Sequence, residues 1–301
     1  MTERYRAAAI QMTVEAVTDP ARRDEIIAEN CHRAMTLIER LAKSEGDPLR
    51  LVVLPACFLQ APLPDRTPDA LKRVAITLPG PELVPLVDLC RQYGLYLAGS
   101  CVERFPALPG WYFHSGFLVG PGGLQIRSPK VQARSVPHVV VVKDRLEEYL
   151  AVVGPDALFP VVDTPIGRLG VLVESEIYVP EVGRALSAKG AEILLHPTLN
   201  RPRTPPRPID AARRARAFEN RCFVLSANHA ATEGSDPVTG SRWRIGSAGG
   251  SAITAPDGHD RAVLANADEG AAVATIDLGE SRDRTNDESA FTPLLYRGVY
   301  C

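Results

Sequence analysis

The chain has 301 residues, 45% of them hydrophobic, and a formal net charge of −2. This size and composition suffice for one large domain with a buried core, residues 1–301, and the near-neutral charge excludes a general nucleic-acid or membrane-surface binder. No apolar run approaches the roughly 20 residues that span a bilayer, and the first residues run into a predicted strand without a basic and then apolar leader. We therefore expect a soluble, cytoplasmic protein.

Strands and helices alternate along the chain, which predicts an α/β fold. Segment 137–150 combines a strand-like part, 139–142, with a helical part, 143–150. The last two predicted strands are expected to complete a second sheet. The other predicted elements, in chain order, are a helix over 18–43, a strand over 51–54, a helix over 81–93, a strand over 95–100, a hairpin over 113–119 and 123–127, a helix over 209–220 and strands over 223–227, 252–254 and 271–276.

The segment from Gly170 to Glu181, GVLVESEIYVPE, has the spacing of a nucleophile elbow, but Glu174 stands where a nucleophile is expected. The apolar run before it predicts a buried strand, and Pro180 begins the next helix. Such a turn presents one side chain to a pocket with backbone N–H groups nearby. Burying a charge costs about several kcal/mol unless it is compensated. Glu174 therefore requires a partner.

Sequence strings in a common order resemble the nitrilase superfamily, the carbon–nitrogen hydrolases. Their shared order over most of the chain makes the resemblance specific. It implies a four-layer αββα sandwich of the nitrilase type, with the active site between the ends of two sheets. The strings are Ala8–Met12 with Asn30, Leu51–Phe58, Arg127–Lys130, the elbow, Gly190–Pro197, Arg216–Asn220 with Asn228, and Gly250–Ser251 with Pro256–Gly258.

The same resemblance implies a glutamate base, a lysine that supports the oxyanion and a cysteine nucleophile, and these positions fall at Ala56, Lys130 and Glu174. A second family glutamate, which supports the lysine, corresponds to Glu147, and Glu176 takes the acidic position after the nucleophile. Thiolate attack on an amide or nitrile needs a thiol and a base. We therefore expect ordinary cysteine-dependent amidase or nitrilase activity to be absent, and we assign catalysis to Lys130, Glu174, Glu147 and Glu176.

Two functions remain open. In the first, Glu174 performs thiol-independent acid–base chemistry on a small, biosynthetic substrate while Lys130 stabilises negative charge. In the second, Glu174 only neutralises Lys130, and the chain is an inactive ligand-binding or scaffold subunit. The first predicts a solvent-open pocket with a free Glu174 oxygen, and the second predicts a filled pocket with Glu174 saturated by Lys130.

Four further residues are candidates for contacting the substrate, and each has a structural alternative. The candidates are His196, Arg201, Arg203 and Trp111. His196 ends a predicted strand, where a capping or core role is favoured over one in lining the pocket. The two arginines would bind an anionic substrate from a Pro/Arg-rich loop, or else that loop is simply solvated and the following arginines, 213, 214 and 216, form an exposed helix face. Trp111 begins an aromatic cluster that could line the pocket or pack in the core.

The cysteines and histidines show no metal-binding or disulfide pattern. The six cysteines lack a Cys-x-x-Cys spacing, which predicts free, buried thiols. Cys57 follows Ala56, but strand alternation directs its side chain away from the pocket, so we do not nominate it. The histidines lack ligand spacing, and we expect no metal and no cofactor.

The resemblance also implies an oligomer. Tyr178 and the tail at about 285–301 resemble family segments that lie at subunit interfaces. We therefore expect a homodimer or larger homo-oligomer that takes a small-molecule substrate or ligand and binds neither nucleic acid nor a membrane.

Overall fold

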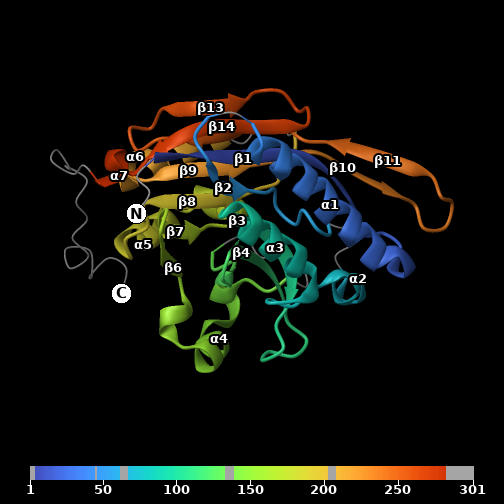
Figure 1. Ribbon diagram of the computed structural model, residues 1–301. Helices are drawn as coiled ribbons and strands as arrows, with labels where there is room; N and C mark the ends of the chain where they lie inside the picture. The colour runs from blue at the N-terminus through green and yellow to red at the C-terminus, as the bar shows by residue number, and fades with distance from the viewer. Residues whose placement is uncertain (1–3, 45, 62–66, 133–138, 203–207, 283–301) are drawn as a thin grey trace.

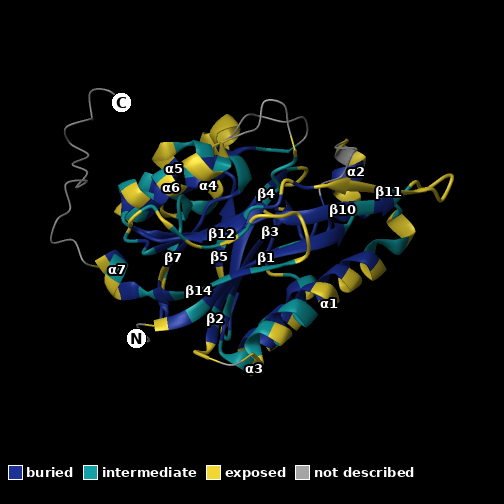
Figure 2. Ribbon diagram, turned by 90° about the horizontal axis from the view of Figure 1, so that it is seen from above, coloured by how far each residue is buried: buried dark blue, intermediate teal, exposed yellow. Residues whose placement is uncertain are grey.

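The computed structural model describes residues 4–44, 46–61, 67–132, 139–202 and 208–282. Two β-sheets face each other across an apolar layer, and helices cover their outer faces (Figure 1). Seen from above, α1 and α3 lie on one side of the buried strands, and α5 and α6 lie on the other (Figure 2). The predicted αββα sandwich is confirmed.

In the described residues, the first sheet has eight strands in the order β11-β10-β1-β2-β3-β4-β5, and β14 also pairs with β1. The prediction that the strand near 271–276 belongs to the second sheet is wrong, because β14 runs antiparallel to β1. The strands are β1 (Arg4–Glu15), β2 (Leu49–Val53), β3 (Tyr96–Arg104), β4 (Tyr112–Gly120), β5 (Gly123–Pro129), β10 (His229–Ser235), β11 (Arg242–Gly246) and β14 (Gly270–Asp277).

The second sheet has six strands in the order β13-β12-β9-β8-β7-β6. Its central strands β7, β8 and β9 are parallel, as expected where helices connect successive strands. The strands are β6 (Val161–Thr164), β7 (Gly167–Val171), β8 (Ile193–Pro197), β9 (Phe223–Ala227), β12 (Ser251–Thr254) and β13 (Asp260–Leu264).

The helices follow the sequence signals closely. The predicted helix over 18–43 begins with a short 3-10 turn, where the Asp19 carboxylate accepts a hydrogen bond from the Ala21 N–H. The α-helices are α1 (Arg23–Ala42), α2 (Pro68–Val74), α3 (Val84–Tyr93), α4 (Leu146–Val153), α5 (Pro180–Ala188), α6 (Ile209–Asn220) and α7 (Leu278–Arg282). The 3-10 helices are η1 (Pro20–Arg22), η2 (Pro81–Leu83), η3 (Val142–Arg145), η4 (Pro155–Ala157) and η5 (Glu174–Tyr178).

Alternation along the strands divides the apolar side chains between the layers. In β1, Ile10 and Met12 pack in the layer under α1 and α3, whereas Tyr5 and Ala9 pack between the sheets. A third apolar cluster lies under α5 and α6. Both faces of the central strands are thus buried, which fixes how far apart the sheets lie and where their strands end.

Gly116 of β4 permits a close approach between the two sheets. A Cβ atom at this position would lie 2.5 Å from the Val171 Cγ1 of β7, a distance that real Cβ atoms essentially never show. The approach positions the site, because Lys130 directly follows β5, the strand beside β4, and Glu174 follows β7.

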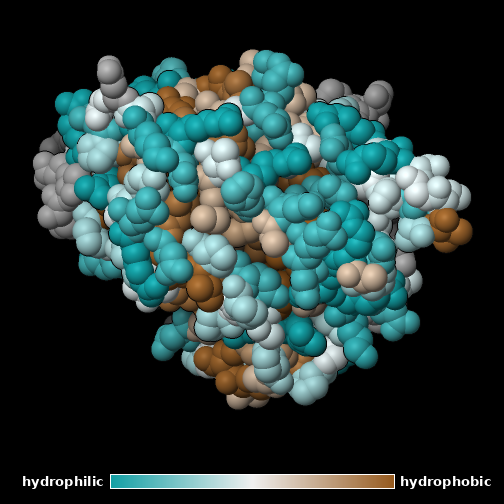
Figure 3. Space-filling view, turned by 45° about the vertical axis from the view of Figure 1, so that its right-hand side comes forward, coloured by the Kyte–Doolittle hydropathy of each residue, from teal (hydrophilic) through white to brown (hydrophobic). Residues whose placement is uncertain are grey.

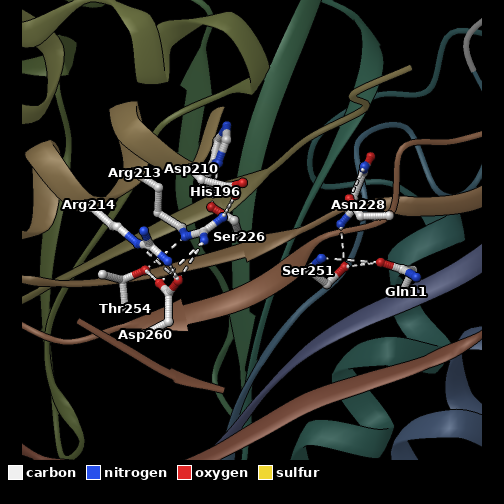
Figure 4. Close-up of polar contacts among 11 residues, drawn as sticks. Gln11, His196, Asp210, Arg213, Arg214, Ser226, Asn228, Ser251, Thr254 and Asp260 are labelled. Atoms are coloured by element: carbon white, nitrogen blue, oxygen red, sulfur yellow. Dashed lines mark hydrogen bonds and ion pairs between the residues drawn. The ribbon is translucent and has the colours of Figure 1, made fainter. Parts of the chain in front are cut away.

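The predicted exposed arginine face on α6 is wrong at two of its three positions, because Arg213 and Arg216 are buried. The Arg213 Nε donates to the Thr254 Oγ1 at 2.8 Å, and its Nη2 forms an ion pair with Asp260 at 3.2 Å (Figure 4). Arg214, which is exposed, contacts the same carboxylate from outside. Arg213 therefore anchors α6 to the second sheet.

We expect Asp260→Ala to lower the free energy of unfolding by about 3 kcal/mol, because it leaves the buried Arg213 charge with only the exposed Asp210 as a carboxylate partner. Urea unfolding followed by circular dichroism measures the change. Arg214→Ala is the matched control, since it removes only an exposed partner, for which about 1 kcal/mol or less is typical. Equal losses in the two variants would show that the buried pair does not anchor the helix.

Candidate active site

Four polar side chains from the first sheet meet one from the second where the strands end. The second sheet contributes Glu174, in the turn after β7. The first sheet contributes Cys57, in the turn after β2, Ser100 on β3, His114 on β4 and Lys130 after β5. The hairpin of β4 and β5 aligns two of them, since the Lys130 N–H donates to the His114 carbonyl at 2.9 Å.

Lys130 and Glu174 form an ion pair across the two sheets. The Lys130 Nζ lies 2.8 Å from the Glu174 Oε2. The lysine side chain is 8% exposed and the glutamate side chain 27%. Burial alone would raise the pKa of Glu174, but Lys130 and His114 outweigh it and hold that pKa well below its usual range. Glu174 is thus an anion at neutral pH, and its Oε1 has no hydrogen bond to any residue that the structure describes.

His114 connects this pair to the turn after β2. Its Nδ1 lies 3.6 Å from the Glu174 Oε2, while its Nε2 lies 2.8 Å from the Ser100 Oγ and 3.4 Å from the Cys57 Sγ. Burial disfavours a charged imidazole, but Cys57 and Glu174 outweigh it and raise the pKa of His114 to about 9. His114 is therefore an imidazolium at neutral pH. No motif in the sequence marks this residue.

The prediction that Cys57 points away from the site is wrong. It assumed that strand alternation continues to residue 57, but β2 ends at Val53 and the chain then enters a turn. Cys57 has a φ of 49° in this turn, so its side chain does not follow the alternation of the strand. The Cys57 N–H donates to the Ser100 Oγ at 3.1 Å, and the thiol faces His114.

The other two predicted catalytic glutamates have different positions. Glu176 is buried, and its carboxylate accepts hydrogen bonds from the Val131 N–H at 2.7 Å and the Val173 N–H at 2.7 Å. It fastens the segment after Lys130 to the elbow, and both of its oxygens are engaged. Glu147 lies on the exposed face of α4, and no hydrogen bond or ion pair joins it to Lys130 in the described residues. The structure therefore gives Glu147 no part in the site.

Two buried histidines support the site from behind. The His196 Nε2 contacts the Glu174 carbonyl at 2.8 Å and its Nδ1 contacts the Ser226 Oγ at 2.8 Å, the latter pair drawn in Figure 4. The His229 Nε2 contacts the Ala56 carbonyl at 2.6 Å. Burial lowers the pKa of each histidine to about 4, so each is neutral and donates to its carbonyl. His196 therefore positions the elbow backbone, and both of its ring nitrogens have partners within the protein.

The remaining predicted substrate contacts are Trp111, Arg201 and Arg203. Trp111 packs on Phe113, and the Arg145 guanidinium lies over its ring, so it belongs to the apolar cluster beside α4. Arg201 is half-buried beyond β8, near enough to His229 to influence its pKa. Arg203 lies outside the described residues.

Several residues from the recognised strings form the scaffold around the site. The Asn30 amide donates to the Leu59 carbonyl at 3.0 Å, which holds the turn that carries Cys57. The Ser251 hydroxyl donates to the Gln11 Oε1 at 3.0 Å and accepts from the Asn228 N–H at 2.9 Å (Figure 4). These contacts bind β1 to the second sheet and contain no group that faces Glu174.

We expect His196→Gln to flatten the acid side of the stability profile. A neutral buried histidine with a folded pKa near 4 and an unfolded pKa of about 6.5 binds fewer protons folded than unfolded between these values. The contribution of the neutral His196 to stability is therefore fully present above the unfolded pKa and is lost as the pH falls towards 4. The variant should lose up to about 1.4 kcal/mol per pH unit of this slope. Urea midpoints from pH 4.5 to 7 measure it, with the exposed His32→Gln as control; an unchanged slope would contradict a neutral His196.

No helix in the described part of the chain is long and apolar enough to cross a membrane. The described residues also contain no group of three or more His, Cys, Asp or Glu side chains placed to hold a metal ion.

Comparison with known proteins identifies the family. The chain is 39% identical over 142 residues to a Pseudomonas protegens protein described as a hydrolase in the pqqF 5′ region, a match that covers 46% of this chain and 46% of that protein. It is 25% identical to omega-amidase NIT2 of Danio rerio over 88% of each chain. Its fold resembles that of Saccharomyces cerevisiae Nit3, a member of branch 10 of the nitrilase superfamily, with a TM-score of 0.73, 20% identity and coverage of 97% of this chain and 98% of Nit3. The carbon–nitrogen hydrolase family model matches residues 6–285, so this chain belongs to the carbon–nitrogen hydrolase family.

Proposed function

We propose that this protein hydrolyses a carbon–nitrogen bond in a small substrate, with Glu174 and His114 as the acid–base pair and Lys130 as the cation that stabilises negative charge. The observation that carries the proposal is the partly exposed Glu174 carboxylate, which is held as an anion and keeps one oxygen without a partner among the described residues. An ion pair that only neutralised Lys130 would gain nothing from exposing this oxygen to solvent.

The chemistry of amide hydrolysis matches these groups. Attack on an amide carbon develops negative charge on its oxygen, and the departing nitrogen must receive a proton. The Lys130 ammonium can stabilise the negative charge on the oxygen, and the His114 imidazolium can donate the proton to the departing nitrogen. The omega-amidase among the relatives suggests an amide as the substrate class. The nucleophile is then either a water, as thiol-independent chemistry requires, or the Cys57 thiol beside His114.

The second candidate is a catalytically inactive ligand-binding or scaffold subunit. It is favoured by the shared use of the Glu174 Oε2, which contacts both Lys130 and His114. A carboxylate held so far on the ionised side is a weak proton acceptor by itself. This candidate predicts binding of a small molecule without turnover, whereas the first predicts ammonia release.

We expect Glu174→Gln and Lys130→Met each to lower the rate of ammonia release by about a hundred- to ten-thousand-fold, the usual contribution of a positioned acid–base group. The assay presents the purified protein with small aliphatic amides, monoamides of dicarboxylic acids and the matching nitriles. Glu29→Gln, an identical change on the exposed side of α1, is the control. Absence of turnover in the wild type, or equal rates in all variants, would favour the scaffold subunit.

The predicted homo-oligomer also belongs to this proposal, as does the cytoplasmic location. Phe218 on α6 is 60% exposed, which is unusual for a large apolar side chain on the helix layer that follows the elbow. Hydrophilic side chains cover most of the face in Figure 3, and a group of hydrophobic ones is visible at its lower end. Leu146 and Val152 of α4 are also exposed. The C-terminal tail, about 285–301, lies outside the described residues.

We expect light scattering to give at least twice the chain mass of 32.6 kDa. Phe218→Glu should shift the population towards the monomer, because it places a charge in the predicted contact. Val238→Glu is the matched control, since Val238 is 90% exposed in the turn between β10 and β11. A monomeric wild type would contradict the predicted homo-oligomer.

A further inference from the structure

We propose that Cys57 is the nucleophile of this site, activated by His114, while Glu174 orients the imidazole. The inference rests on the proposed function and assigns its central group. In the pattern that the sequence resembles, an acid stands at position 56 and a thiol at position 174. Here the acid is Glu174 at the elbow and the thiol is Cys57, next to position 56, so the two groups have exchanged sides of the site.

The geometry is that of a thiol, an imidazole and a carboxylate in series. The Cys57 Sγ lies 3.4 Å from the His114 Nε2, and the His114 Nδ1 lies 3.6 Å from the Glu174 Oε2. The Nδ1 faces the carboxylate and the Nε2 faces the thiol, with the Ser100 hydroxyl also within hydrogen-bond distance of the Nε2. An imidazole held between a carboxylate and a thiol is the arrangement that activates a nucleophile. Lys130 holds the carboxylate from its other side.

The turn that carries Cys57 is held on both sides of the residue. The Ala56 N–H donates to the Thr198 carbonyl at 3.2 Å, and the Ala56 carbonyl accepts from His229. The Cys57 carbonyl accepts from the Gln60 N–H at 3.0 Å and the Ala61 N–H at 2.7 Å. These contacts fix where the thiol lies with respect to His114.

Both residues that contact His114 from turns have left-handed backbones, with φ 49° at Cys57 and 51° at Glu174. A non-glycine residue in this conformation costs about 1 kcal/mol. A strained residue in a turn after a buried strand is also how nucleophile elbows present a reactive side chain. The chain has such a residue in the turn after β2 and in the turn after β7, and the one after β2 is a cysteine.

The environment of Cys57 differs from that of other buried thiols in the chain. His114 is cationic at neutral pH, and its charge lies beside the Cys57 sulfur. Two other cysteines lack this environment: Cys31 contacts the Met35 sulfur and Cys90 the Val119 carbonyl, and burial raises their pKa values to about 11 and about 12. They are protonated, unreactive thiols at neutral pH.

The reaction that follows balances with water as its co-reactant. The Cys57 thiolate attacks the carbonyl carbon of a primary amide, a C–S bond forms, and the carbonyl electron pair moves to oxygen. The C–N bond then breaks, and the nitrogen takes the proton of His114 and leaves as ammonia, which gives a thioester and a neutral imidazole. Water transfers a proton to His114 and adds to the thioester carbon. The C–S bond breaks, and the carboxylic acid and the thiolate–imidazolium pair are released.

Two other interpretations of the same contacts make different predictions. Cys57 is 4% exposed and also belongs to the apolar cluster under α1 and α3, so it could be a packing residue. The Ser100 hydroxyl lies closer to the His114 Nε2, at 2.8 Å, and could be the nucleophile instead. In the first case Cys57 reacts no faster than Cys31. In the second, Ser100→Ala abolishes turnover and Cys57→Ala does not.

The first test is alkylation by iodoacetamide at pH 7 on the native protein in a Cys301→Ser background, with peptide mass spectrometry to locate the adducts. An ordinary thiol is only a few per cent ionised at this pH, so a thiolate should react about tenfold faster or more. We expect this excess for Cys57 over Cys31 and Cys90, and we expect His114→Gln to remove it. An equal rate at Cys57 and Cys31, or a Cys57 rate that His114→Gln leaves unchanged, overturns the proposal.

The second test is turnover of the best amide by Cys57→Ala and Cys57→Ser, with folding checked by circular dichroism. We expect a loss of about a hundredfold or more in both variants. If Cys57→Ala retains turnover while Glu174→Gln loses it, Cys57 is not the nucleophile, and the proposed hydrolysis still stands. Selective alkylation of Cys57 without ammonia release from any amide supports the activated thiol and overturns the proposed hydrolysis.

Discussion

The ion pair between Lys130 and Glu174 keeps the carboxylate at the tip of the elbow charged. A carboxylate at the tip of the elbow is acceptable only because an ammonium lies 2.8 Å away. Cys57 and the Glu174 anion both favour a proton on His114, whose charged ring lies beside the Cys57 sulfur. The pair also joins the two sheets, since Lys130 follows a strand of the first and Glu174 follows a strand of the second. The electrostatics of the site therefore require the whole sandwich.

Most other polar contacts near the site hold backbone in place. His196 and Glu176 fix the elbow, and the Arg216 Nε donates to the Ile177 carbonyl within the same turn at 3.1 Å. His229 and Asn30 fix the turn with Cys57. Many of these residues belong to the strings by which the sequence resembles its family. Such strings therefore carry strong information about the fold and weaker information about the chemistry at the two turns.

The resemblance to the family predicted the layers, and the cost of burying a charge predicted that Glu174 needs a partner. Apolar periodicity and turn residues predicted most elements, because they report local structure directly. It missed His114, although the predicted hairpin almost supplied it. Pairing Gly120 with Gly123 would place residue 113 opposite Lys130, but an irregularity at Leu118 and Val119 shifts the register by one residue. That shift brings His114 to the lysine. Cys57 was missed because a positive φ in a turn leaves no periodic signal. The sheet that holds β14 was assigned wrongly because pairing with β1 is a long-range choice.

The charge on His114 is the property most sensitive to these contacts, since Cys57 and Glu174 both raise its pKa. Nitrogen NMR of 15N-labelled histidine side chains, with His114→Gln for assignment, follows both ring nitrogens as the pH changes. The account predicts a doubly protonated ring at pH 7 that titrates near pH 9, and a titration several tenths of a pH unit lower or more in Glu174→Gln, where one anionic neighbour is lost. A ring that is neutral at pH 7 in the wild type would contradict the arrangement of charges on which the site is built.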